Sequence, residues 1–331
     1  MGVDVGFFNI ISLTVDVFNE ELNNAVISSV ASIPSYQGID LGQYPPTNAG
    51  AYENKGYEIG LSLGKAFKTG IEFNLGGYVA YNKNNVINDG EISRGADYAY
   101  PYRDQGFSYG QVFGYLVDYS NGNGFYNFKG ELDKGPKYSF GTPRLGDLKF
   151  KDLNHDGIID DKDIAPITNG AIPNYTFGIN GFIKYKSFDL SILMEGVGKW
   201  TSVYTGLGVW ENPYDGVFGS LHQNAWTQDR WNNGEKITSP ALTTGQSTSL
   251  QVCDYYVYDR SYLRLKNLEL GYTLPVKLTK SFGFESLRFV LSGQNLLTWD
   301  HMKSKDFGPE ADSYQSIPVY RVYNIGVRAN F

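Results

Sequence analysis

Cysteine is almost absent from this sequence of 331 residues, because Cys253 is the only one. The chain can therefore form neither an intrachain disulfide nor a zinc site built from several cysteines. Charged residues make up only 19%, and the formal net charge is -7, with a pI of about 5.1. Because nucleic-acid binding depends on a basic surface that neutralises phosphates, this charge balance argues against a nucleic-acid partner.

Long apolar runs are missing as well. The sequence holds no stretch of the ~18 consecutive apolar residues that a transmembrane helix needs, and its mean hydropathy is -0.33. What it has in abundance is aromatic residues, at 15%, and glycine, with 39 residues. This composition is typical of β structure. It is also compatible with a membrane barrel, whose strands look polar on average because only every second residue faces lipid.

Apolar and polar residues alternate with period 2 in several segments, which predict β-strands. Eight such segments are 3–17, 57–67, 71–81, 175–185, 188–198, 262–274, 287–299 and 319–331. Each is near or above the ~9–11 residues that a tilted strand needs to cross the hydrocarbon of a membrane. In 262–274 the alternation changes phase at Lys266-Asn267, which predicts a β-bulge. Residues 110–117 are a candidate for one further crossing of an additional pair.

The connections between these segments alternate in length. The turns at 68–70 and 186–187 are short, whereas 18–56, 82–174, 199–261 and 300–318 are long. Outer-membrane barrels have short periplasmic turns and long extracellular loops. We therefore expect an all-β, transmembrane antiparallel β-barrel with a periplasmic C-terminus. Tyr and Trp near the segment ends fit the interfacial girdles of such barrels. A soluble β-sandwich with one polar face is the alternative.

One motif carries recognisable chemistry, in residues 152–163. Alternate oxygen-bearing side chains in a tight loop suit a hard cation, and the spacing matches a calcium loop. The expected ligands are Asp152, Asn154, Asp156, the Ile158 carbonyl, Asp160 and Asp163, with Gly157 at the turn. No helix is expected before the loop, so it is not an EF-hand pair. The alternative is a set of Asx-turns without an ion. If calcium binds, we expect it to hold an extracellular loop rigid.

Residues for catalysis are not assembled in the sequence. His155, His222 and His301 are dispersed without the spacing of a zinc site or a catalytic triad, so we do not expect an enzyme. Trp210, Trp226 and Trp231 crowd one long connection, and aromatic faces beside polar groups suit stacking on sugar rings. We name these three as candidate substrate-binding residues, with simple loop packing as the alternative.

Several stretches, taken together and in order, resemble the carboxyl-terminal part of the SusC/RagA family of TonB-linked (TonB-dependent) outer-membrane transporters. They are residues 48–56 leading into 57–60, 146–152 feeding the 152–163 loop, 175–178, 188–191, 261–267, 270–275, 292–297 and the end at Phe331. Each motif is weak alone, but the set covers essentially the whole chain, so that residues 1–331 correspond to one part of such a receptor.

The resemblance implies a barrel of about 22 strands in the outer membrane of a Gram-negative cell, in contact with its lipids. It implies import of glycans or peptides together with a SusD-like surface lipoprotein. The amino-terminal plug and the first strands lie outside this chain, so contact with the TonB complex is expected only through that missing part. The resemblance also implies that Asn324, Gly326, Ala329 and Phe331 belong to the signal read by the barrel-assembly machinery.

Two other interpretations stay open at this point. One is a secreted β module that is stabilised by calcium and binds carbohydrate. The other is a truncated reading frame without a function of its own, because the chain begins directly in a strand and has no recognisable export signal. Composition does not distinguish a glycan importer from a peptide importer.

Overall fold

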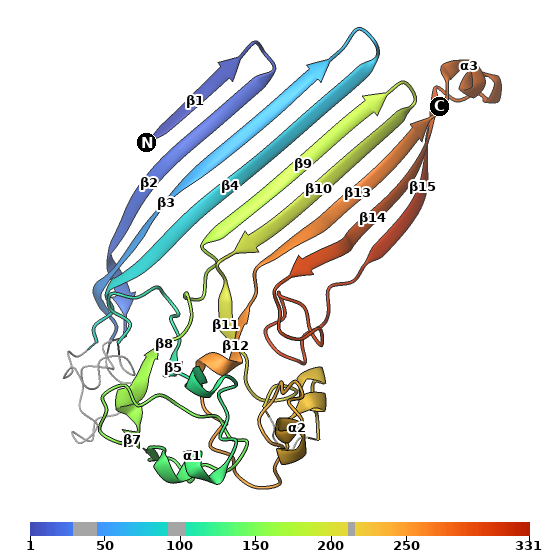
Figure 1. Ribbon diagram of the computed structural model, residues 1–331. Helices are drawn as coiled ribbons and strands as arrows, with labels where there is room; N and C mark the ends of the chain where they lie inside the picture. The colour runs from blue at the N-terminus through green and yellow to red at the C-terminus, as the bar shows by residue number, and fades with distance from the viewer. Residues whose placement is uncertain (29–44, 92–102, 211–215) are drawn as a thin grey trace.

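A single antiparallel sheet of nine strands dominates the computed structural model, which describes residues 1–28, 45–91, 103–210 and 216–331. Its strands are β1 (Gly2–Phe7), β2 (Ile11–Ile27), β3 (Thr47–Ala66), β4 (Ile71–Asn88), β9 (Tyr175–Tyr185), β10 (Phe188–Gly198), β13 (Tyr262–Thr273), β14 (Ser286–Asp300) and β15 (Val322–Asn330). They lie side by side in chain order, with β1 and β15 at opposite edges (Figure 1). The predicted all-β antiparallel fold is confirmed for this sheet, while closure into a barrel stays a prediction.

The hairpin between β1 and β2 corrects the prediction of one strand over 3–17. Phe8 and Asn9 both have a positive φ, of 53° and 55°, and the Ile10 N–H donates to the Phe7 carbonyl at 3.0 Å. Phe7 pairs with Ile11, so odd-numbered residues face odd-numbered residues across the turn. Odd-numbered residues therefore stay on the same face of the sheet before and after the turn. Because of this, the alternation of apolar and polar residues continues across the turn without a change of phase. The sheet therefore has nine strands, not eight.

Three strands extend well beyond the predicted segments. β2 continues to Ile27, β3 begins at Thr47, and β4 continues to Asn88. The added residues are largely polar, and they still pair in register, for example Asn19 with Lys55 and Asn54 with Asn84. Apolar alternation marks only the part of a strand that has an apolar face, so the predicted connections 18–56 and 82–174 were too long.

The short turns and the bulge agree with the prediction. Tight turns at 68–70 and 186–187 join β3 to β4 and β9 to β10. In β13 the pairing with both neighbours shifts between Leu265 and Asn267, which leaves Lys266 as the bulged residue. The suggestion that 110–117 crosses the membrane was wrong. Its strand β5 (Phe113–Tyr115) pairs with β8 (Ile164–Pro166) outside the main sheet.

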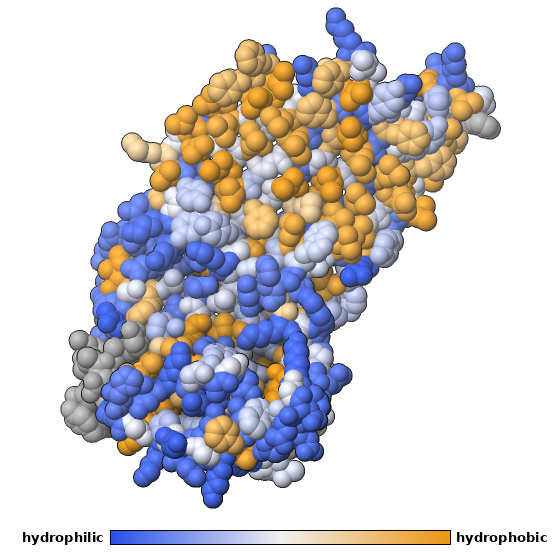
Figure 2. Space-filling view, viewed as in Figure 1, coloured by the Kyte–Doolittle hydropathy of each residue, from blue (hydrophilic) through white to orange (hydrophobic). Residues whose placement is uncertain are grey.

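One face of the sheet exposes its apolar side chains. A row of directly opposed residues crosses five strands, and their side chains stay 47%, 37%, 45%, 53% and 88% exposed at Ile183, Leu190, Leu270, Leu291 and Ile325. Hydrophobic residues gather over the strands on the side of the short turns and give way to hydrophilic ones toward the long loops (Figure 2). A β-sandwich would bury such rows against a second sheet, so the exposure argues against that alternative.

An aromatic row lies nearer to the long loops on the same face. Tyr57, Tyr81 and Tyr175 are directly opposed on β3, β4 and β9. Their ring centroids lie 5.5 Å apart between the first two and 4.8 Å apart between the last two. Amphipathic rings at one level, below an apolar band, are the arrangement that a membrane interface favours.

The protein-built hydrophobic core lies outside the sheet, in what we call the loop module: the described residues within 103–174, 199–261 and 300–321. Besides β5 and β8, the module contains α1 (Lys129–Lys134), β6 (Lys137–Tyr138), β7 (Ile158–Ile159), β11 (Thr201–Val203), α2 (Gln228–Asn232), β12 (Val257–Asp259) and the 3₁₀ helices Tyr119–Asn121, Asp161–Asp163, Ser220–Asn224 and Asp254–Tyr256. Val117, Leu148 and Ile159 are fully buried there.

Helices are short throughout the described part of the chain. α3 (Val276–Thr279) and the 3₁₀ helix Lys280–Phe282 fill the connection between β13 and β14, at the end of the sheet opposite to the loop module (Figure 1). Among the described residues, no helix has both the length and the apolar character that crossing a membrane requires.

Candidate functional site

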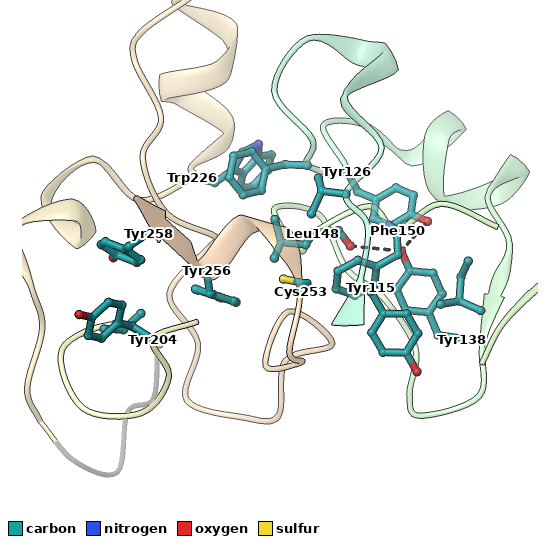
Figure 3. Close-up of a cluster of buried hydrophobic side chains, with 14 of the residues drawn as sticks. Tyr115, Tyr126, Tyr138, Leu148, Phe150, Tyr204, Trp226, Cys253, Tyr256 and Tyr258 are labelled. Carbon is teal, nitrogen blue, oxygen red and sulfur yellow. Dashed lines mark hydrogen bonds between the residues drawn. The ribbon is translucent and has the colours of Figure 1, made fainter. Parts of the chain in front are cut away.

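Tyr138 is the centre of the loop-module core. Its hydroxyl accepts the Phe150 N–H at 2.9 Å and donates to the Leu148 carbonyl at 3.2 Å. The Tyr126 hydroxyl lies 3.2 Å away (Figure 3). Burial raises the pKa of Tyr138, so the hydroxyl stays neutral and can act as donor and acceptor at once. One side chain thereby fixes the extended segment that leads into the acidic loop.

The acidic loop at 152–163 is held by its own side chains. The Asp152 carboxylate accepts the Gly157 N–H at 2.8 Å, and the Asp156 carboxylate accepts the Ile158 N–H at 2.9 Å. The Asn154 carbonyl oxygen accepts the Asp156 N–H at 3.1 Å. The bonds of Asn154 and Asp156 span two residues and are Asx-turns, whereas the bond of Asp152 spans five residues.

Asp163 closes the loop from inside the module. It is fully buried, and its carboxylate accepts the N–H groups of Leu153 at 2.6 Å and Asp160 at 2.9 Å. Burial raises the pKa of Asp163, and these backbone hydrogen bonds act in the opposite direction. The Asp163 side chain thereby joins the backbone at Leu153, near the start of the loop, to the backbone at Asp160, near its end.

Calcium binding by this loop stays a prediction. Among the described residues, no group of three or more His, Cys, Asp and Glu side chains is arranged to hold a metal ion. The expected ligand set also contains the Asn154 amide and the Ile158 carbonyl, which are oxygen donors of other kinds. Asp152 Oδ1 is buried and has no hydrogen-bond partner, so one carboxylate oxygen remains for a further ligand.

The three candidate tryptophans lie in or against the loop-module core. Trp226 is 7% exposed, and its indole N–H donates to Asn127 Oδ1 at 3.0 Å. Trp231 packs against Phe128 with ring centroids 6.1 Å apart, and Trp210 packs against Tyr256 at 6.3 Å. The structure therefore assigns packing contacts to all three, while sugar binding by them stays a prediction.

The face of the sheet opposite to the apolar row carries ion pairs. Arg288 on β14 pairs with Asp189 on β10 and, at 2.7 Å, with Glu269 on β13. Lys266 at the bulge pairs with Glu195 at 2.8 Å. Gly271 lies under the Arg288 guanidinium, where an added Cβ would meet it at 2.3 Å. Charges therefore cluster on one side of the sheet and apolar rows on the other.

A tyrosine-lined cavity in the loop module is the feature that sequence reasoning missed. Its volume is about 370 Å³, and Tyr255, Tyr256 and Tyr258 line it together with Lys236 and Lys303. The run of tyrosines at 255–258 was a signal that could have indicated an aromatic site. Lys303 lies about fifty residues after these tyrosines, beyond β13 and β14, and Lys236 lies in the connection that precedes them. Spacing in the sequence alone therefore could not bring the two lysines together.

The four residues implied in assembly lie on or just beyond β15. Asn324, Gly326 and Ala329 belong to this edge strand, and all but Ala329 are exposed. Phe331 packs against Phe284, with ring centroids 5.0 Å apart. Their role in assembly stays a prediction.

Comparison with known proteins finds relatives that are TonB-dependent receptors. No family model matches the sequence. The chain is 28% identical over its whole length to TonB-dependent receptor P3 of Formosa agariphila, of which it covers 33%. It is 26% identical over 81% of its length to TonB-dependent receptor P26 of the same organism, of which it covers 26%. The chain thus spans a third or less of the length of these relatives.

Solved structures give the same picture for the fold. The whole chain aligns with 34% of a chain in the structure of the RagAB peptide transporter, with a TM-score of 0.69 and 20% identity. It aligns equally with 35% of a chain in the closed-closed state of the RagAB peptide importer, with a TM-score of 0.68 and 21% identity. In sequence and in fold, the chain therefore resembles a fragment of a SusC/RagA-type TonB-dependent receptor.

Proposed function

We propose that this chain is part of an outer-membrane, TonB-dependent nutrient importer that takes up oligosaccharides. The observation that carries the proposal is the two-sided sheet. Its apolar row is exposed where lipid would cover it, and its ion pairs lie on the opposite face, where a lumen would hydrate them. The likeness to TonB-dependent receptors over the whole chain supports the same conclusion. The role is transport, with no reaction catalysed by this chain.

The proposed orientation follows from the two ends of the sheet. The short turns and α3 face the periplasm, together with the end of β15, and the loop module faces the outside of the cell. A module with its own buried core, outside the apolar band, suits an aqueous compartment. In this orientation the acidic loop and the tyrosine-lined cavity are both extracellular.

The proposed partners are those of a paired importer. A SusD-like surface lipoprotein binds on the extracellular side, which is supported by the two-component RagAB importers that share the fold. Energy from the TonB complex reaches the transporter through parts outside this chain. The barrel-assembly machinery inserts the strands, and Asn324, Gly326, Ala329 and Phe331 contribute to its signal.

Peptide uptake is the second candidate function. It is favoured by the solved structures, because both RagAB matches are described as peptide transporters or importers. Saccharide uptake is favoured by the cavity of the loop module, since its tyrosine rings beside the hydroxyl groups of Thr238 and Ser239 suit stacking on a sugar ring and hydrogen bonding to it.

Deletion of the gene in the native organism tests the proposal. We expect the protein in the outer-membrane fraction, and loss of uptake of fluorescent oligosaccharides in the deletion strain, restored by the complete gene on a plasmid. Peptide uptake measured in parallel should be unchanged. Loss of peptide uptake alone would transfer the assignment to the second candidate, and a protein found in the soluble fraction would contradict both.

A further inference from the structure

The cavity of the loop module has an unusual charge for this protein. Its lining contains Lys236 and Lys303 and no Asp or Glu, although acidic residues outnumber basic ones in the chain by 35 to 28. In a chain with an excess of acidic residues, a cavity that is lined by two ammonium groups and no carboxylate is unexpected. The local charge favours an anionic ligand.

Lys303 is held over aromatic rings. Its ammonium group lies 5.6 Å from the ring centroid of Tyr255 and 5.5 Å from that of Tyr258, and it donates to the Tyr255 carbonyl at 2.6 Å. Desolvation by the surrounding protein lowers the pKa of Lys303, and the nearby Cys253 and Asp254 offset this in part. The Asp254 carboxylate also accepts the Val117 N–H at 2.9 Å. An ammonium group has three donors, so Lys303 retains capacity for an anion.

Ser239 supplies a second polar group that awaits a partner. The residue is 3% exposed and lines the cavity, and its hydroxyl is buried without a hydrogen-bond partner. Buried hydroxyl groups are normally hydrogen-bonded, because leaving one unpaired costs about 1–3 kcal/mol. A ligand that offers hydroxyl groups would satisfy it.

We propose that this cavity binds an acidic sugar unit, one that carries a carboxylate or a sulfate group. The acid group lies against Lys303, with Lys236 adding to the positive charge. The sugar ring packs against the tyrosines, and one of its hydroxyl groups bonds to Ser239. This inference rests on the proposed uptake of oligosaccharides and narrows it to anionic ones.

Ligand-observed NMR on the protein tests this inference, after expression from its complete gene and purification in detergent. The probes are galacturonate, galactose 6-sulfate and neutral galactose, which share one ring. We expect at least one acid to bind about tenfold or more tightly than galactose, because a charge-assisted hydrogen bond is worth about that factor. Raising the ionic strength should weaken binding of the acid and leave galactose unaffected.

Matched variants separate the lysine charge from folding. Lys303→Met should weaken binding of the acid about tenfold and leave galactose binding unchanged, which shows that this variant is folded. Lys303→Arg should retain most of the acid binding, because it keeps the positive charge. Ser239→Ala should weaken both acidic and neutral sugars. Lys129→Met, an exposed lysine on α1 outside the cavity lining, should change nothing.

Three outcomes would overturn the inference. These are equal binding of galactose and both acids, unchanged binding of the acids in Lys303→Met, and equal Lys303-dependent binding of the dipeptide Gly-Glu. None of these outcomes contradicts the proposed importer function, which is tested separately by the uptake of oligosaccharides in the deletion strain. If uptake of neutral oligosaccharides depends on the gene while the cavity does not bind the acidic sugars, only the inference of an acidic-sugar site fails.

Discussion

At the scale of single residues, Tyr138 shows how few side chains organise the loop module. Tyr138→Phe keeps the packing and removes the hydroxyl that serves Phe150 and Leu148. Two buried backbone groups then lose their partner, so we expect a loss of about 1–3 kcal/mol in the free energy of unfolding of the module. Tryptophan fluorescence in urea, to which Trp210, Trp226 and Trp231 of the loop module contribute, measures it. Tyr109→Phe, at an exposed ring, is the control and should change the midpoint by little.

The acidic loop gives a second residue-scale prediction. Titration calorimetry of calcium into the detergent-purified protein should release heat that Asp156→Ala abolishes, because position 5 of the loop supplies a direct ligand. Asp133→Ala, at an exposed carboxylate on α1, should leave the heat unchanged. Removing calcium with a chelator should lower the thermal midpoint of the loop module. A calcium titration without heat in the unsubstituted protein would show that the Asx-turns hold the loop unaided.

At the scale of elements, the sequence predicted strands best where a tight turn separates two apolar alternations. β9 and β10 agree with their predicted segments to the residue, because Lys186 and Ser187 interrupt both patterns. The β1–β2 hairpin was missed because its register preserves parity. The polar ends of β2 and β3 were missed because pairing through the backbone needs no apolar side chain. The alternation of apolar and polar residues therefore shows which face of a strand is apolar more reliably than it shows where the strand begins and ends.

The two faces of β9 make a sharp element-scale test. Ile179 lies in the exposed apolar face, and Asn180 on the other side of the same strand. Ile179→Arg should destabilise insertion by about 2–4 kcal/mol, as arginine does near the midplane of a bilayer, whereas a lumen-facing arginine costs little. The yield of heat-modifiable protein in the outer-membrane fraction measures this difference between Ile179→Arg and Asn180→Arg. Equal yields would mean that lipid does not cover this face.

At the scale of the whole molecule, the apolar side chains of the sheet and those of the loop module have different surroundings. The strands leave rows of Leu, Ile and Val exposed, while the loop module buries aromatic residues in a core of its own. The sequence predicted the first part, because alternation is local. It did not predict the second, since the core and the cavity combine residues from 119, 239, 258 and 303, which only the fold brings together.

The position of Cys253 turns the loop module into its own reporter. This thiol is the only one in the sequence, it is fully buried between Leu148 and Tyr256 in the core (Figure 3), and burial raises its pKa. A maleimide can reach it only when the module opens, because reaction requires an accessible thiolate. The rate of alkylation therefore measures how often the loop module opens, and in the proposed orientation a membrane-impermeant maleimide would reach it from outside the cell.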